Sequence, residues 1–191
     1  MEPPQPTFNI TDYFEKMDAN IRAIMQRPEK DNLTYDILDT ENTRKHKLIA
    51  HLERLRVMKQ GEIWQTMIGN FHTFTDLKVG HPTGLDILSE ERKIAMELKN
   101  RTNTDNHSAK KSNMNKLAKF KRENPEYTCV YANINDSTEA KTMNSQPKPI
   151  VWEGAEIQVL TGMSLLRFIF GENVDAVIEF TRNTIDKYYS G

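Results

Sequence analysis

Two carboxylates and a lysine are spaced so that a β-hairpin would bring them together. Within residues 84–100, apolar side chains flank a short polar segment and predict two strands joined by a tight turn. A turn centred between Glu91 and Arg92 sets Asp86 opposite Glu97 on the neighbouring strand. Side chains alternate along a strand, so Glu97 and Lys99 share one face while Leu98 points to the other.

These side chains could hold a divalent cation. Directly opposed side chains on adjacent strands lie roughly 5 Å apart at Cβ, and like charges there are destabilising. Burying the carboxylates of Asp86 and Glu97 without partners would cost several kcal/mol each, so something must compensate. Mg²⁺ is the simplest compensation, because it takes one or two carboxylates and keeps waters for substrate phosphates. The alternative is a surface strand with an ordinary cross-strand ion pair.

The spacing resembles a nuclease motif. A Glu-x-Lys triplet alone is unspecific, since the chain contains three, but only the middle one lies in an apolar run with an acidic residue one hairpin upstream. Asp86, a hairpin and then Glu97-Leu98-Lys99 is similar to the active-site motif of the PD-(D/E)XK nuclease superfamily. The polar segment 100–111 resembles small type II restriction endonucleases in particular. The likeness covers residues 60–170, although Leu85 stands where the family has proline.

The resemblance implies hydrolysis of phosphodiester bonds in double-stranded DNA at a short specific sequence, leaving 5′-phosphate ends. Asp86 and Glu97 would hold Mg²⁺ with the carbonyl of Leu98 as a further ligand, and Lys99 would orient the attacking water or neutralise the phosphorane. Mn²⁺ is expected to substitute, and Ca²⁺ to support binding only. Glu62, on the helix before the hairpin, is a secondary catalytic candidate. The alternative is a glutamate that favours the helix dipole.

The resemblance also implies partners. Cutting both strands of a symmetric site calls for a homodimer, and a cognate DNA methyltransferase encoded nearby would protect the host genome. Two other functions stay open: a structure-selective or DNA-repair nuclease of the same fold, and a DNA-binding module that does not cut. The presence of all three of Asp86, Glu97 and Lys99 favours a cutting enzyme.

A local basic cluster follows the proposed metal site. Between residues 100 and 122 seven lysines and arginines stand against one acid, Asp105, whereas the whole chain has a net charge of −1. Next to a metal site, such a cluster favours phosphate binding and base reading, and a merely solvated basic helix is the alternative. The predicted DNA-binding residues are Asn100, Arg101, Asn103, Asn106, Ser108, Lys110 and Lys111.

Length and composition set the broad class. The 191 residues are expected to form one domain, with residues 1–9 as a flexible N-terminal arm. The single Cys129 excludes an intramolecular disulfide and is expected to be a core thiol. The sequence shows neither a signal peptide nor an apolar run of membrane length, so a cytoplasmic protein is expected.

The remaining pattern predicts an α/β fold. Helical spacing of apolar residues predicts helices at 11–27, 44–57, 62–71, 108–122, 161–170 and 174–188, and apolar runs predict further strands at 127–134, 150–152 and 156–160. In the second helix Leu48, Ile49, Leu52 and Leu55 are expected to face inward. This order gives a three-layer sandwich with a mixed central sheet flanked by helices, which is also the core that the resemblance implies.

Overall fold

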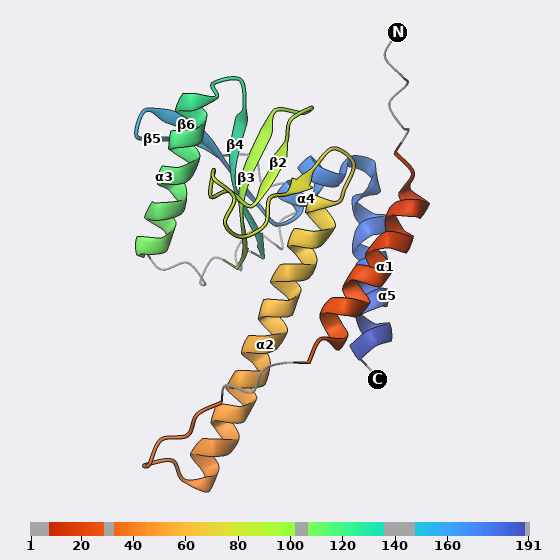
Figure 1. Ribbon diagram of the computed structural model, residues 1–191, viewed down its shortest axis with the longest axis vertical. Coiled ribbons are helices and arrows are strands. Elements are labelled where there is room, and N and C mark those ends of the chain that lie inside the picture. Colours follow the sequence, from red (N-terminus) through yellow and green to blue (C-terminus); the bar gives the residue numbers. More distant parts are fainter. Residues whose placement is uncertain (1–7, 29–32, 102–106, 136–147, 190–191) are drawn as a thin grey trace.

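The computed structural model describes residues 8–28, 33–101, 107–135 and 148–189 (Figure 1). Its helices are α1 (Ile10–Gln26), α2 (Glu41–Gly69), α3 (His107–Glu123), α4 (Gly162–Phe170), the short 3-10 turn η2 (Gly171–Asn173) and α5 (Val174–Tyr189). Its strands are β1 (Thr75–Asp76), β2 (Ile87–Ser89), β3 (Ile94–Arg101), β4 (Thr128–Asn135), β5 (Lys148–Trp152) and β6 (Ala155–Thr161).

The strands form one mixed six-stranded sheet in the order β1-β2-β3-β4-β6-β5. β1, β2 and β3 are antiparallel neighbours, as are β5 and β6 at the other edge. β3, β4 and β6 run parallel in the centre, and α3 connects β3 to β4. Antiparallel strands can be joined by a tight turn, whereas parallel ones need a crossover, which is the role of α3.

Helices cover both faces of the sheet (Figure 1). Met96 and Val130 point towards α2 and α4, with α1 and α5 packed beyond, whereas Ala95 and Cys129 point towards α3. Because successive residues of a strand face opposite ways, β3 and β4 each contribute to two separate apolar cores. The predicted α/β fold with a mixed central sheet between helices is confirmed.

α2 is one continuous helix, so the two separate helices predicted at 44–57 and 62–71 were wrong. Gly61 lies inside it, where a glycine weakens a helix by only about 0.5–1 kcal/mol relative to alanine. A Cβ at Gly61 would lie 3.6 Å from the Cβ of Asn100, so α2 passes close to β3 here. Nδ2 of Asn100 also donates to the backbone oxygen of Val57, at 3.1 Å. These contacts with β3 support the helix through its glycine.

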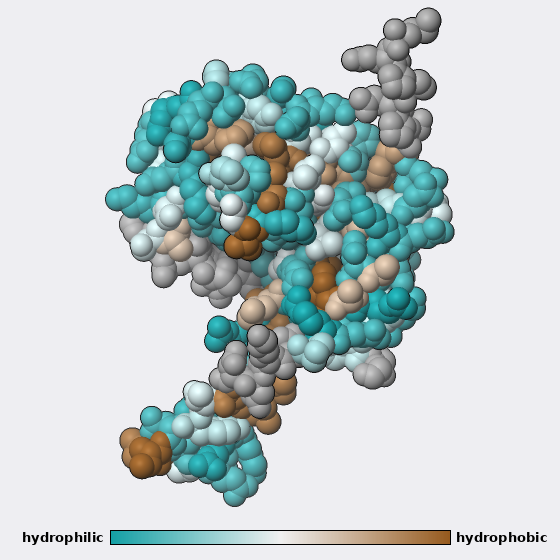
Figure 2. Space-filling view, in the orientation of Figure 1, coloured by the Kyte–Doolittle hydropathy of each residue, from teal (hydrophilic) through white to brown (hydrophobic). Residues whose placement is uncertain are grey.

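The first part of α2, residues 41–52, projects from the rest of the molecule as an arm (Figure 1). Leu48, Ile49 and Leu52 were predicted to face the core, but 44%, 64% and 55% of their surfaces are exposed. Helical spacing correctly showed that these side chains share a stripe, but it could not show that this part of α2 extends beyond the sheet. Figure 2 shows hydrophobic surface on the loop that leads into the arm, where Ile37 and Leu38 are 98% and 84% exposed, and further patches along the arm.

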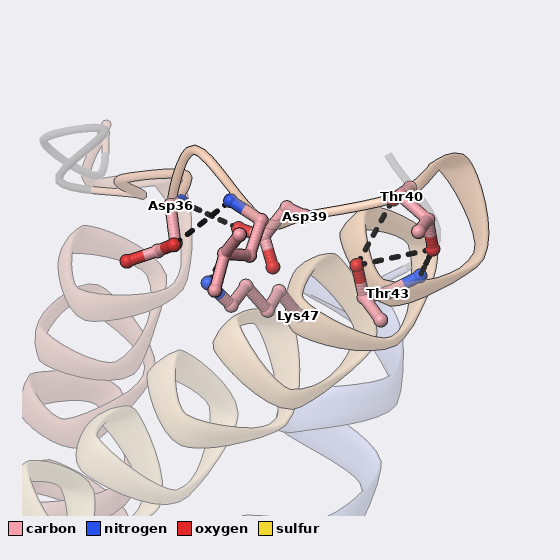
Figure 3. A network of polar contacts seen from close by, with 6 residues as sticks. Asp36, Asp39, Thr40, Thr43 and Lys47 are labelled. Atoms are coloured by element: carbon pink, nitrogen blue, oxygen red, sulfur yellow. Dashed lines mark hydrogen bonds and ion pairs between the residues drawn. The ribbon is translucent and has the colours of Figure 1, made fainter.

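Local polar contacts fix the start of the arm (Figure 3). Oγ1 of Thr40 accepts a hydrogen bond from the backbone N–H of Thr43 at 3.3 Å, which caps the first turn of α2. Asp39 pairs with Lys47, and this contact lowers the pKa of Asp39. The segment before α2 is therefore tied to the helix that it leads into.

The start of the described chain belongs to the folded body. Asn9 caps α1, since its side chain accepts from the backbone N–H of Thr11 at 2.9 Å. The ring of Phe8 lies 4.8 Å from that of Phe71, centroid to centroid. Residues 8 and 9 of the predicted N-terminal arm thus contact the folded body, and residues 1–7 lie outside the described residues.

Three further observations bear on the sequence analysis. Cys129 is buried, as expected for a core thiol, and burial raises its pKa to about 11. Strand β1 was not predicted, because its two residues are too few to show an alternating pattern. Among the described helices, none combines the length and the apolar character needed to cross a membrane.

Candidate active site

The hairpin of β2 and β3 has the predicted register. Ile87 pairs with Met96 and Leu88 with Ala95 across the antiparallel ladder, which sets Asp86 opposite Glu97. The Asp86 carboxylate is held in place by the strand itself, because its Oδ2 accepts from the backbone N–H of Leu98 at 2.7 Å. The spacing of the sequence therefore brings two carboxylates to the same part of the sheet.

Glu97 is a buried carboxylate with one oxygen satisfied. The residue is only 2% exposed, and its Oε1 accepts from the ammonium of Lys99 at 2.8 Å. Lys116, on α3, lies 3.9 Å from the same oxygen. Oε2 is buried and has no hydrogen-bond partner among the described residues. Burial, and then the nearby Asp86, raise the pKa of Glu97, because both disfavour its charged form.

This donor set fits a hard divalent cation. Carboxylate oxygens are the ligands that Mg²⁺ prefers, and a buried oxygen without a partner is costly unless a cation or a donor satisfies it. In the described part of the chain, no three His, Cys, Asp or Glu side chains gather into one group. A cation between Asp86 and Glu97 would therefore need further ligands from the backbone, water or substrate phosphates.

Glu62 is not brought to this pair. It lies in the middle of α2, so it is not a first-turn glutamate either, and its carboxylate pairs with both terminal nitrogens of Arg27 at 2.7 and 2.9 Å. α2 packs on the face of the sheet that carries Met96, whereas Glu97 points to the opposite face, towards α3. The sheet itself therefore separates Glu62 from the two aligned carboxylates.

α3 lies over the face that carries Glu97 and Lys99. Ser108, Lys110 and Lys111 are exposed near its start, and the ammonium of Lys110 lies 5.9 Å from the centre of the Tyr131 ring. The predicted basic surface thus begins beside the carboxylates. It contains several exposed cations at one end of a helix, the kind of surface that phosphate groups bind.

The other predicted DNA-binding residues are placed less uniformly. Asn100 is engaged within the fold, since its Oδ1 accepts from Nδ2 of Asn135 at 2.7 Å while its Nδ2 bonds to α2. Arg101 ends β3, but its side chain is outside the described structure, and Asn103 and Asn106 lie outside the described residues.

The site can be compared with a known enzyme family. A family model of the Eco47II restriction endonuclease matches residues 16–169, which include the hairpin, α3 and β4. The chain belongs to the Eco47II restriction endonuclease family. No curated protein matches the chain. As a member of this family, the chain is related to nucleases of restriction systems, and its buried acidic pair lies inside the matched region.

The sequence patterns did not point to one buried polar residue on the face of the sheet that carries Glu97. Asn133 on β4 pairs with Lys99 on β3 in the parallel ladder, so it lies on the same face of the sheet as Lys99 and Glu97. It is 3% exposed, and its Oδ1 is buried without a hydrogen-bond partner in the described structure. A polar residue inside the apolar run 127–134 was the signal that could have identified it.

Proposed function

We propose that this protein is a Mg²⁺-dependent type II restriction endonuclease of the PD-(D/E)XK kind, which cuts double-stranded DNA at a short specific sequence. Its membership of the Eco47II family supports the general class. The observation that carries the finer proposal is the buried carboxylate of Glu97, opposite Asp86 and beside Lys99, with one oxygen unpaired.

Asp86 and Glu97 would hold the cation, with the carbonyl of Leu98 as a further ligand. Bound Mg²⁺ lowers the pKa of a coordinated water and stabilises charge on phosphoryl oxygens. Glu97 must be ionised to act as a ligand, and Asp86 is kept in position by the amide of Leu98. Lys99 would orient the attacking water or neutralise charge on the phosphate, and the products would carry 5′-phosphate and 3′-hydroxyl ends.

The DNA surface would extend from the end of β3 to the start of α3. Arg101, Asn103, Asn106, Ser108, Lys110 and Lys111 are the proposed contacts, together with Asn100 where its amide is not engaged within the fold. We expect Lys110→Gln with Lys111→Gln to weaken DNA binding measured in Ca²⁺. The slope of the logarithm of the binding constant against the logarithm of the salt concentration should fall by about one for each of these lysines that neutralises a phosphate. Lys16→Gln, at an exposed position on α1, is the matched control.

We further propose a homodimer, because each chain supplies one acidic pair and a duplex has two strands to cut. The exposed stripe of the arm is the surface that we assign to the second copy. Leu52 and Leu55 also line a groove of about 580 Å³ with Ile185 and Tyr188 of α5, so the stripe continues into a concave apolar surface. Two identical stripes and grooves can bury each other about a twofold axis.

The setting in the cell follows from the same proposal. An enzyme of this kind would act in the cytoplasm, where the foreign DNA enters. A cognate DNA methyltransferase encoded nearby would protect the host genome, with no stable complex implied. Modification of the host DNA at the recognised sequence would be the corresponding observation.

The test is digestion of long unmethylated DNA by the wild-type protein, Glu97→Ala and Lys99→Ala in Mg²⁺, Mn²⁺ and Ca²⁺. Discrete fragments in Mg²⁺ and Mn²⁺, intact DNA in Ca²⁺, and loss of cutting in both variants would support the proposal. Specific binding without cutting in any metal would instead indicate a DNA-binding module. Cutting at branched or damaged DNA without a fixed sequence would indicate a structure-selective or repair nuclease.

A further inference from the structure

Two buried acceptors lie on the same face of the sheet, on neighbouring strands. Oε2 of Glu97 and Oδ1 of Asn133 are the buried side-chain oxygens that lack hydrogen-bond partners within the described residues. Glu97 is on β3 and Asn133 on the neighbouring β4, and the residue in register with Asn133 is Lys99. Oε2 of Glu97 is accounted for by the proposed cation, whereas Asn133 has no role in the proposed chemistry so far.

Stability does not explain Asn133. Tyr131, two residues earlier on the same face of β4, is buried, and Asn133 itself is 3% exposed. A buried acceptor without a partner costs free energy, and an apolar side chain of similar shape would avoid that cost. A residue that is unfavourable for the fold and stands beside a reactive lysine is a candidate for function.

The sheet order gives Asn133 a definite place. Asp86 precedes β2 on one side of β3, and Asn133 is on β4, on the other side. Lys99 and Glu97 lie on β3 between them. In the structure the Lys99 ammonium is 2.8 Å from Oε1 of Glu97, where it partly neutralises the carboxylate.

With a cation held by Asp86 and Glu97, the Lys99 ammonium would lose part of its attraction to Glu97 and would be repelled by the cation, because like charges at such short range interact strongly in a buried site. The ammonium would then favour the side of β3 away from β2. The unpaired Oδ1 of Asn133 lies on the opposite side, on the residue paired with Lys99.

We propose that Asn133 is a positioning residue for the nuclease reaction: in the cation-loaded enzyme its Oδ1 accepts a hydrogen bond from the Lys99 ammonium and fixes the position of that ammonium on the face of the sheet that carries Glu97. This inference rests on the proposed function. Asn133 would act on the position of the Lys99 ammonium and not on the binding of the cation or of DNA.

The test compares Asn133→Leu, which removes the acceptor with little change in shape, and Asn133→Asp, which keeps an acceptor oxygen. We expect Asn133→Leu to lower kcat by about 10–100-fold, as for other supporting hydrogen bonds, with little change in KM or in DNA binding in Ca²⁺. Its Tm should equal or exceed that of the wild type, because an unpaired buried acceptor is removed. Asn133→Asp should retain most of kcat.

Wild-type kcat in Asn133→Leu, or an equal loss of kcat in both variants, would overturn the acceptor role. A fall in Tm and DNA affinity together with kcat would show that Asn133 is structural. A wild-type protein that cuts no DNA would refute the proposed function instead. Digestion of DNA by the wild type alone therefore separates failure of the proposed function from failure of the role of Asn133.

Discussion

The ammonium of Lys99 lies 2.8 Å from Oε1 of Glu97, two residues earlier on the same strand and on the same face of the sheet. The ion pair satisfies only half of the carboxylate, since the buried Oε2 has no partner in the described chain. Glu97 is thus an incompletely compensated charge in the fold. This arrangement costs stability in the metal-free protein and leaves an oxygen available to a cation.

Replacing Glu97 by glutamine should stabilise the metal-free protein at neutral and alkaline pH. Burial and Asp86 raise the pKa of Glu97, so the folded state binds this proton more tightly than the unfolded chain does. Protonated Glu97 therefore adds to the free energy of unfolding. This contribution is fully present below the ordinary glutamate pKa and is lost as the pH rises through the raised pKa of Glu97 in the folded protein. Glu97→Gln avoids that loss.

Thermal unfolding in EDTA between pH 4 and 8 measures this effect. The Tm of Glu97→Gln should exceed that of the wild type at pH 8, and the difference should shrink towards pH 4. Each kcal/mol corresponds to about 2–4 °C in a chain of this size. Glu90→Gln is the matched control, since it makes the same change from carboxylate to amide at an exposed position. A lower Tm of Glu97→Gln at pH 8 would mean that its pairing with Lys99 outweighs the cost of its burial.

Glu62→Gln should leave catalysis almost unchanged. The carboxylate is 42% exposed, is paired with Arg27, and lies on the helix layer opposite to Glu97. An exposed ion pair contributes at most about 1 kcal/mol, so the expected effect is a small fall in stability. Cleavage rates in Mg²⁺, compared with those of Arg27→Gln, measure this. A large loss of kcat in Glu62→Gln alone would restore Glu62 as a catalytic residue.

Two glycines of α2 should respond oppositely to alanine. A Cβ at Gly69 would lie 2.8 Å from the backbone nitrogen of Asp76 and would also clash with its Cβ, so Gly69→Ala must displace β1. Overpacking of this kind costs about 1–3 kcal/mol. Gly61→Ala meets only an ordinary contact with Asn100 and should gain up to about 1 kcal/mol in helix stability. Chemical denaturation of both variants measures the contrast, and a destabilised Gly61→Ala would contradict it.

Charges on the arm should separate the proposed dimer. Ile49→Glu with Leu52→Glu places two carboxylates on the exposed stripe, where they would be buried against the second copy. We expect the wild type to sediment as a dimer and the double variant as a monomer with nearly unchanged Tm. Val79→Glu, at another fully exposed position, is the control. A wild-type monomer, or a double variant that remains dimeric, would show that the stripe is not the interface.

Much of the site follows from the sequence alone. The register of the hairpin was predictable because a tight turn allows few alternatives, and a slip of one residue would have moved the apolar side chains to the wrong face. That register places Asp86 opposite Glu97. The alternation of β3 likewise determined that Lys99 shares the face of Glu97. The polar character of α3 indicated the basic surface that lies over them.

Only the tertiary structure decided which other residues join this site. Helical spacing could not show that the stripe of Leu48 and Leu52 would remain exposed, because a stripe does not reveal what packs against it. The resemblance suggested Glu62, but α2 packs on the opposite face of the sheet and Glu62 pairs with Arg27. Asn133 joins the site through the parallel pairing of β3 and β4, a contact between residues 34 positions apart that no local pattern encodes.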